Sequence, residues 1–390
     1  MSAPIVILGS GLAGISVARE LRKLDKQVPL IIVTADDGGF YSKPNLSNAL
    51  AAGKSAAQLA LTPMAQLATQ LNASVIHAHT QVERILPEEH ALETGNGKIV
   101  YSKLVLAVGA QPIRLPLQGE GAAAVLSVNH LNDYAMFREQ LEGKRRVAIL
   151  GAGLIGCEFA NDLRVTGVDV AVFDLAPQPL ARLLPTRAAA FFRARLETAG
   201  VRFHFDTSIE AITLSSQGEG GSSSYRLVDK HGNAHTTDLV LSAVGLKPAT
   251  ALAQAAGLKT ARGIVVDKML RTSDPDIYAL GDCAEVEGLV LPFVMPIMQA
   301  ARALAKTLAG DTGSGELVYP AMPVVVKTPA CQAVVCPPPT GATGAWREEA
   351  GPAGVRALFV GAGGKPLGFS LVGEAVKEKQ ALAAQMPAWL

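Results

Sequence analysis

Short apolar runs alternate with stretches of helical periodicity along much of this chain. Two stretches share the order strand, helix, strand, namely residues 4–8, about 12–24 and Pro29–Thr34 in the first, and residues 147–150, about 154–166 and Asp169–Phe173 in the second. Short buried strands that alternate with helices are typical of parallel sheets covered by helices. The pattern therefore predicts an α/β fold with two such units.

Two later apolar segments resemble each other and indicate how the units are connected. Lys103–Ala110 reads KLVLAVGA and Asp238–Gly245 reads DLVLSAVG, and each is followed closely by a proline, Pro112 or Pro248. Such paired segments suit the places where a chain leaves and re-enters one domain. We therefore expect one domain at 1–112 and 241–318, a domain inserted at 113–240, and a C-terminal α+β domain at 319–390.

Composition narrows the class of protein. The 390 residues are 49% hydrophobic, which predicts an ordered globular chain of two or three domains. A net charge of +1 gives no support for a nucleic-acid surface, and four cysteines argue against a disulfide-built secreted protein. The apolar stretch Gly288–Ala301 contains two prolines and is too short to span a bilayer. We expect a cytoplasmic protein that binds neither nucleic acid nor membrane.

Each strand–helix–strand unit carries a G-x-G-x-x-G turn between its first strand and its helix. The turns read IVILGSGLAG and VAILGAGLIG, with glycines at Gly9, Gly11 and Gly14 and at Gly151, Gly153 and Gly156. Glycines there let the backbone approach a pyrophosphate, and the helix N-terminus favours its negative charge. One such motif is a weak signal, whereas two in register predict two dinucleotide sites. Two sites suggest that electrons pass from one bound dinucleotide to the other.

An acidic residue at the end of the second strand of such a unit normally bonds the adenosine ribose. In the first unit Asp36 is the nearest acidic residue, and Asp37 could take its place; in the second unit the equivalent residue is Asp174. A carboxylate there accepts hydrogen bonds from ribose hydroxyls and repels a 2′-phosphate. The second site is therefore expected to prefer NADH over NADPH.

The most specific stretch of the chain is Thr272–Ala284, TSDPDIYALGDCA. A buried strand at Ile277–Leu280 runs into Gly281 and Asp282, which leaves a carboxylate at a strand end, where flavin ribityl hydroxyls could bind. A helical pattern then begins at Pro296. The free N–H groups of its first turn would stabilise negative charge on a reduced flavin.

Two further features of the second unit allow more than one interpretation. Glu158 follows the third glycine of the second turn by two residues, so it is either a partner of the helix dipole or a group that faces the nicotinamide or a flavin. The second feature is a series of arginines. They either form a solvated helical face, or contact NADH phosphates or steer an acidic redox protein. The series comprises Arg182, Arg187, Arg193, Arg195 and Arg202.

The two glycine turns, Thr272–Ala284 and the segment YSKPNLS at 41–47 closely resemble the FAD-dependent pyridine-nucleotide disulfide oxidoreductase superfamily. Within it, the chain is similar to the ferredoxin-reductase-like branch. YSKPNLS together with GDCAE and LPFVMPI (291–297) looks most like bacterial NADH-dependent rubredoxin reductases, and flavorubredoxin reductases are close relatives. The resemblance covers almost the whole chain and is weakest after about residue 328.

The resemblance implies a function for each domain and for named residues. It implies a Rossmann-like FAD-binding domain at 1–112 and 241–318, a Rossmann-like NAD-binding domain inserted at 113–240, and a C-terminal interface domain at 319–390. Lys43 and Glu158 are expected as catalytic residues near the reactive side of the flavin, where they could form an ion pair. Cofactor contacts are implied at Gly9, Ser10, Gly11, Leu12, Gly14, Thr34, Asp36, Lys43, Val82, Gly151, Gly153, Leu154, Gly156, Glu158, Asp174, Gly245, Gly281, Asp282, Val294 and Lys327.

The cysteines and histidines supply negative information about the chemistry. Disulfide reductases of this superfamily need a dithiol beside the flavin, and neither the first helix region nor the NAD domain has one here. Cys331 and Cys336 form a C-x4-C in the last domain, where we expect ordinary free thiols. The seven histidines show no metal-ligand spacing, so no metal site is expected.

Without a dithiol relay, electrons should leave the flavin directly for an external acceptor. The resemblance thus implies that the protein accepts a hydride from NADH on FAD and passes single electrons to rubredoxin. Rubredoxins are typically acidic, and turnover requires release, so we expect a transient complex with a monomeric reductase. The alternative acceptors are a flavorubredoxin or a ferredoxin. An NADH oxidase, a quinone reductase or an NADH-sensing flavoprotein is less favoured.

Overall fold

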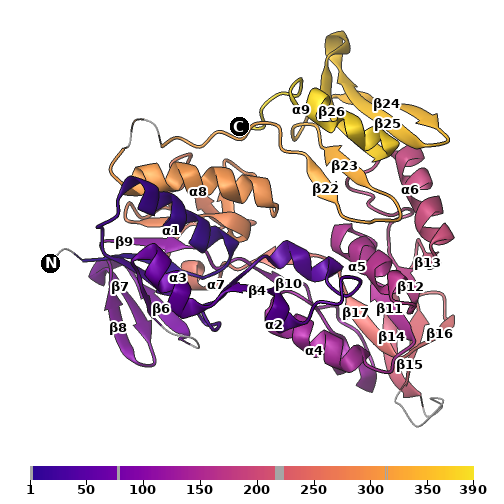
Figure 1. Cartoon of the computed structure of the whole chain (residues 1–390), viewed down its shortest axis with the longest axis horizontal. Helices are drawn as coiled ribbons and strands as arrows, with labels where there is room; N and C mark the ends of the chain where they lie inside the picture. Colours follow the sequence, from indigo (N-terminus) through magenta and orange to yellow (C-terminus); the bar gives the residue numbers. More distant parts are fainter. Residues whose placement is uncertain (1–2, 77–79, 216–223, 312, 314) are drawn as a thin grey trace.

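The computed structural model describes every residue except 1–2, 77–79, 216–223, 312 and 314. Figure 1 shows three lobes: one around α1 and α8, one around α5 and β11, and one formed by β22–β26 with α9. No helix in the described part of the chain combines the length and apolarity needed to cross a membrane.

The first lobe is built on a parallel sheet whose central strand precedes the first glycine turn. The side chains of this central strand, β1 (Ile5–Leu8), are all buried, because a parallel sheet covered on both faces leaves its middle strand no solvent-facing side. Helices α1 (Leu12–Leu24) and α8 (Val294–Leu308) pack against each other beside this sheet (Figure 1). In spatial order the strands are β20 (Ile277–Ala279), β9 (Lys103–Leu106), β1 (Ile5–Leu8), β2 (Leu30–Val33) and β5 (Ser74–Ile76).

The second lobe repeats this plan around the second glycine turn. Helix α5 (Leu154–Val165) follows the turn, and α4 (Leu131–Leu141) and α6 (Thr186–Thr198) complete the lobe. The parallel strands are, in order, β13 (Val201–His204), β12 (Asp169–Phe173), β11 (Arg146–Leu150) and β17 (Leu239–Ser242). An antiparallel sheet shares an apolar cluster with them and comprises β14 (Ile209–Ser215), β15 (Ser224–Asp229) and β16 (Ala234–Thr237).

A short antiparallel ribbon joins the path into the second lobe to the path out of it. It pairs β10 (Ala110–Pro112) with β18 (Leu246–Pro248). These strands follow β9 and β17, the two segments whose sequences resemble each other. The pairing explains the resemblance, because both segments end a parallel strand and then turn into the same ribbon.

The third lobe is an antiparallel sheet, and three of its strands contact the second lobe. Helix α6 packs against β24, β25 and β26, as Figure 1 shows. At the chain end, the N–H of Trp389 donates to the carbonyl of Tyr319 at 2.8 Å, so the last residues return to the start of this lobe. The sheet order is β22 (Val324–Val326), β23 (Ala333–Cys336), β26 (Pro366–Gly373), β25 (Gly354–Gly361) and β24 (Gly344–Gly351), and α9 (Lys379–Ala383) follows.

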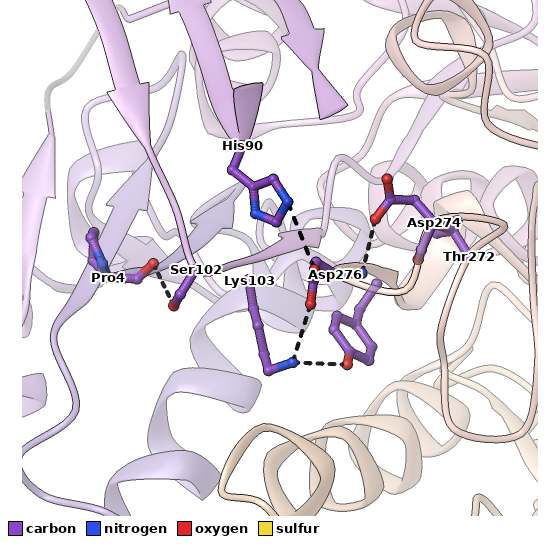
Figure 2. Close-up of polar contacts among 8 residues, drawn as sticks. Pro4, His90, Ser102, Lys103, Thr272, Asp274 and Asp276 are labelled. Atoms are coloured by element: carbon purple, nitrogen blue, oxygen red, sulfur yellow. Dashed lines mark hydrogen bonds and ion pairs between the residues drawn. The ribbon is translucent and has the colours of Figure 1, made fainter. Parts of the chain in front are cut away.

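Smaller elements fill the edges of the first lobe. They are β3 (Phe40–Tyr41), α2 (Ala56–Leu59), β4 (Ala60–Thr62), α3 (Met64–Leu71), β6 (Val82–Leu86), β7 (Ala91–Thr94), β8 (Gly97–Val100), α7 (Ala251–Ala255), β19 (Ile264–Val266) and β21 (Ala284–Val286). A polar cluster ties the β7 end of this region to the amino ends of β9 and β20 (Figure 2). Lys103 Nζ lies 3.5 Å from Asp276 Oδ1 and 3.4 Å from the Tyr278 hydroxyl, and His90 Nε2 lies 3.8 Å from Asp276 Oδ2. This edge is opposite to the one that carries the glycine turn, so the cluster is a structural contact.

The predicted α/β class is confirmed, and most predicted elements lie within a residue or two of the observed bounds. One boundary was wrong: α8 begins at Val294, and Pro296 is its third residue rather than its first. The reason is that the N–H groups of the whole first turn have no partner within the helix, so proline is tolerated throughout that turn. The division into domains at 113, 241 and 319 stays a prediction.

Candidate functional site

Each glycine turn has the same backbone geometry at the carboxyl end of its strand. The first glycine takes a positive φ, +117° at Gly9 and +105° at Gly151. A Cβ at the third glycine would lie 2.0 Å from the Gly9 carbonyl oxygen in the first turn and 1.9 Å from that of Gly151 in the second. Helix and strand therefore approach each other more closely than any larger residue allows.

The middle glycine of each turn faces open space. A Cβ at Gly11 or Gly153 would meet nothing within 4 Å, and each of these residues is the exposed N-cap of the helix that follows. Neither cap has a side chain bonded to the first N–H groups. An open approach to unpartnered N–H groups at a helix N-terminus is the geometry that binds a pyrophosphate. Both turns therefore fit a dinucleotide, and Leu12 and Leu154 begin the two helices.

The first turn is bordered by the end of β2. The Ser10 hydroxyl donates to Thr34 Oγ1 at 2.9 Å, and both residues are buried. The Thr80 N–H donates to the Thr34 carbonyl at 3.2 Å, which brings the start of β6, with Val82, towards the same edge. Asp36 is exposed beyond β2, where its N–H donates to Thr34 Oγ1 at 3.2 Å. These residues, predicted from different parts of the sequence, are adjacent in the fold.

The GDCAE segment is held against the helix of the first turn. Gly281 has a φ of +78°, and a Cβ there would lie 2.8 Å from the Ala13 side chain. This close packing places Asp282 beside the first turn, where its charge interacts with that of Lys43. Burial raises the pKa of Asp282 and lowers the pKa of Lys43, and in each case the opposite charge of the other works against the shift. Val294 begins α8 and is exposed.

Lys43 and Glu158 do not form the ion pair expected between them. Lys43 Nζ donates to Asn129 Oδ1 at 2.7 Å, and Asn129 Nδ2 donates to the Ala110 carbonyl at 3.0 Å. The cation beside Glu158 is Lys327, whose Nζ lies 3.6 Å from Glu158 Oε2. The reason is tertiary: the third lobe supplies a closer lysine than the segment that contains Lys43.

Glu158 is buried, and its contacts are with other residues of the protein. Its side chain is 0% exposed, and it accepts hydrogen bonds from Ser47 Oγ at 2.5 Å and from the Lys327 N–H at 2.8 Å. Lys327 Nζ in turn donates to the Pro44 carbonyl. Burial raises the pKa of Glu158, with the Lys327 charge working against the shift. Glu158 thus joins Ser47 of the first lobe to Lys327 of the third.

Asp174 lies where the second site needs a carboxylate. It follows β12 directly, is half-buried, and accepts hydrogen bonds from the Ala152 N–H at 2.5 Å and the Ala176 N–H at 2.7 Å. One of these donors is part of the second glycine turn, so the carboxylate is fixed beside the turn. Because an ionised carboxylate has about four acceptor positions, it can still accept from ribose hydroxyls.

Gly245 closes the other side of the second site. It is exposed, has a φ of +119°, and its carbonyl accepts a hydrogen bond from Ile113 at 3.1 Å. A Cβ at Gly151 would lie 2.6 Å from the Ala243 carbonyl oxygen, so the β17–β18 connection packs directly on the glycine turn. The structure therefore brings Gly245 to the same sheet edge as Asp174.

Cys331 and Cys336 are buried free thiols that lie in separate apolar clusters. Cys331 belongs to an apolar cluster shared with α5, and Cys336 belongs to a separate cluster with Phe369. Burial raises the pKa of each thiol to about 11. Both are therefore protonated and poorly nucleophilic at neutral pH.

Sequence reasoning missed three residues that hold this region together: Ser47, Asn129 and Asp162. Ser47 lies within the YSKPNLS motif, so a signal for it existed. Asn129 and Asp162 had none, because each contacts backbone or side chains in segments more than eighty positions away. Their importance follows only from the packing of the lobes.

Two dinucleotide turns on two parallel sheets, joined to a third antiparallel lobe, define a two-nucleotide oxidoreductase. Residues 3–307 match the family described as pyridine nucleotide-disulphide oxidoreductase, and residues 316–386 match the rubredoxin binding C-terminal domain. The chain therefore belongs to the pyridine nucleotide-disulphide oxidoreductase family, whose members typically bind FAD.

Individual relatives are similar over almost the full length. A Rubredoxin-NAD(+) reductase from Alcanivorax borkumensis is 48% identical over 392 residues, which cover 99% of this chain and 99% of that protein. A nitric oxide reductase FlRd-NAD(+) reductase from Vibrio vulnificus is 38% identical, with coverage of 97% and 96%. The crystal structure of a ferredoxin reductase from Rhodopseudomonas palustris matches with a TM-score of 0.86 at 28% identity, covering 99% of this chain and 96% of that one.

The geometry of the second turn predicts that one alanine substitution lowers stability and that another weakens NAD+ binding. Gly156→Ala places a methyl group against the Gly151 carbonyl and should lower the free energy of unfolding by about 1–3 kcal/mol. Gly153→Ala meets no atom in the protein, so its cost should stay below about 1 kcal/mol. It should instead weaken NAD+ binding about tenfold, about 1.4 kcal/mol, because the methyl group enters the path of the pyrophosphate. Urea unfolding and NAD+ titration distinguish the two, and equal stabilities would contradict this assignment.

The buried position of Glu158 predicts a pH-dependent contribution to stability. Its folded-state pKa is raised above the ordinary value of 4.5, so its stabilising effect is complete below that value and declines as pH rises through the folded pKa. The thermal midpoint of wild type minus that of Glu158→Gln should therefore fall as pH rises from about 4.5, because glutamine does not titrate. Thermal unfolding at a series of pH values tests this. A difference that grows with pH would mean that the pairing with Lys327 outweighs burial.

Proposed function

We propose that this protein transfers electrons from NADH to rubredoxin, with FAD as the bound cofactor. The observation that carries the proposal is the similarity over nearly the full chain to proteins named Rubredoxin-NAD(+) reductase, together with the match of residues 316–386 to a rubredoxin-binding domain. The two dinucleotide turns supply a place for each nucleotide.

The first lobe is proposed to hold FAD and the second to hold NADH. We assign 1–112 with 241–318 to FAD, 113–240 to NADH and 319–390 to the acceptor. When bound, FAD would take two electrons together as a hydride and release them one at a time, as an iron acceptor requires. The residues proposed to contact it are Gly9, Ser10, Gly11, Leu12, Gly14, Thr34, Asp36, Lys43, Val82, Gly281, Asp282, Val294 and Lys327.

The protein's own groups are proposed to orient the two nucleotides. The helix that follows each glycine turn directs its N-terminus at a pyrophosphate. Lys43 is half-buried and its charge interacts with that of Asp282, so it would bring a positive charge to the site of the first cofactor. Glu158 keeps Lys327 and Ser47 in position through the contacts described above, and in this proposal it is a positioning residue.

The acceptor is proposed to bind the third lobe transiently, with a monomeric reductase. Two arginines of the series considered for docking form hydrogen bonds within the protein. Arg187 donates to the Glu348 carbonyl at 3.4 Å, and Arg195 donates to the Pro352 carbonyl at 3.0 Å, so both join α6 to the third lobe. These contacts with neutral carbonyls leave both positive charges in place, so the two side chains can still attract an acidic partner. The four free cysteines suit a reducing cytoplasm.

The test is steady-state NADH oxidation by the FAD-loaded protein with rubredoxin as acceptor. Ferredoxin, a flavorubredoxin domain, quinone and air serve as controls. Turnover with rubredoxin that is much faster than with every control is the expected result. Rapid reduction of the flavin by NADH without transfer to rubredoxin would refute the named acceptor and leave the flavoenzyme assignment intact.

The position of Asp174 predicts the choice between NADH and NADPH. Asp174→Ala removes an acceptor for the ribose and a charge that repels a 2′-phosphate. We expect kcat/KM for NADH to fall about 10- to 100-fold, as loss of a hydrogen bond to a charged group would cause. The ratio of kcat/KM for NADH to that for NADPH should fall with it, and an unchanged ratio would show that Asp174 does not set the preference. Asp169→Asn, at an exposed position on the same strand, is the control.

A further inference from the structure

Helix α5 carries three polar side chains that are buried on one face. Glu158, Asn161 and Asp162 are 0%, 2% and 3% exposed. Their spacing of three and four residues places them side by side along the helix. All three bind groups from outside the second lobe, so this face of α5 is where the lobes meet.

The first lobe is bound to this face through backbone amides. The N–H of Leu50 donates to Asp162 Oδ2 at 2.9 Å, and the N–H of Ala51 donates to Asp162 Oδ1 at 3.2 Å. Both carboxylate oxygens are therefore used by consecutive amides. Ser47, four residues from Ala51, bonds Glu158 one helical turn earlier. The segment 43–51 is thus bound to α5 at two positions, Glu158 and Asp162, one helical turn apart.

The third lobe is bound to the same face. The N–H of Ala330 donates to Asn161 Oδ1 at 3.0 Å, and the N–H of Lys327 donates to Glu158. Apolar residues from all three lobes surround these contacts in a single cluster that includes Leu46, Phe159 and Val335. Helix α5 is therefore packed between the other two lobes by both polar and apolar contacts.

A buried carboxylate is a costly way to join two segments. Burial raises the pKa of Asp162, the two amide hydrogen bonds work against that shift, and the charge of Glu158 adds to it. Well-packed apolar side chains often join segments with equal or greater stability. What the carboxylate adds is direction, because two amides must meet two oxygens in one plane for both bonds to form.

We propose that Asp162 is a positioning residue for electron transfer between the two nucleotides. The inference rests on the proposed function. Asp162 fixes the segment 43–51, which contains Lys43, to a helix whose N-terminus is the second glycine turn. Since a helix rises 1.5 Å per residue, Asp162 lies roughly 13 Å along α5 from Gly153. The same rigid element therefore sets where Lys43 lies relative to the NADH turn.

The kinetic test is the reduction of the flavin by NADH in a stopped-flow instrument, with no acceptor present. At saturating NADH, Asp162→Ala should reduce the limiting rate about 10- to 100-fold, because misplacement by about 1 Å is enough for such a loss. The dissociation constant for NADH should stay within about twofold. The primary isotope effect of deuterated NADH on this limiting rate should be larger in Asp162→Ala than in wild type. Asp162→Asn keeps one acceptor oxygen and should recover part of the rate.

A second readout does not depend on activity. Hydrogen–deuterium exchange of the FAD-loaded protein should be faster in peptides that contain Leu50 and Ala51 in Asp162→Ala than in wild type. Peptides that cover 9–15 should be unchanged, because no contact of Asp162 reaches the first glycine turn. Unchanged exchange at Leu50 and Ala51 would overturn the proposal.

Asp229→Asn is the matched control for a general loss of stability. Asp229 is also a buried aspartate of the second lobe, 5% exposed, and it accepts from the N–H groups of His231 and Asn233 at 2.9 Å. It lies on β15 and makes no contact with segment 43–51. Asp229→Asn should lower the thermal midpoint and leave the limiting rate unchanged.

The outcomes separate this inference from the proposed function. A limiting rate in Asp162→Ala equal to that of wild type, or a loss equal to that in Asp229→Asn, would overturn the positioning role alone. A wild-type flavin that NADH cannot reduce would overturn both. Failure of rubredoxin to accept electrons would overturn only the proposed acceptor, because the flavin half-reaction is measured without it.

Discussion

The close contact between strand and helix in each glycine turn is the constraint on which the rest of this structure depends. A Cβ at Gly14 or Gly156 would lie 2.0 or 1.9 Å from a carbonyl oxygen, so only glycine permits the approach. Because the approach is so close, the N-terminus of each helix opens at the carboxyl edge of its sheet, beside open space at Gly11 and Gly153. The same contact made twice yields two nucleotide sites on two sheets.

Helix α5 links the second glycine turn to the other two lobes, and we propose that it holds the two nucleotide sites at a constant separation. Its N-terminus forms one site, and its buried face binds a segment of the first lobe and a segment of the third. Glu158 and Asp162 are kept in an apolar cluster by hydrogen bonds from Ser47, Lys327, Leu50 and Ala51. The free-energy cost of burying these two carboxyl groups is offset by their hydrogen bonds. These bonds also have a fixed direction, which apolar packing alone does not supply.

The third lobe contributes contacts to the candidate site. Lys327 comes directly after β22 and brings its amide and its ammonium group to Glu158, the latter at 3.6 Å. Helix α6 joins the opposite side of that lobe to the second one through Arg187 and Arg195. An acceptor bound to the third lobe would therefore rest on an element that is joined to the second lobe at two places.

The sequence by itself determined the parallel sheets, the two turns and the family, because these follow from local patterns. Apolar runs predict β1 and β11, and the glycine spacing predicts the helices after them. The tertiary structure alone decided which cation meets Glu158 and what Lys43, Asn129 and Asp162 contact. Those contacts join residues 86 to 169 positions apart, and one sequence holds no local signal for which of several lysines or amides will be nearest once three lobes have packed.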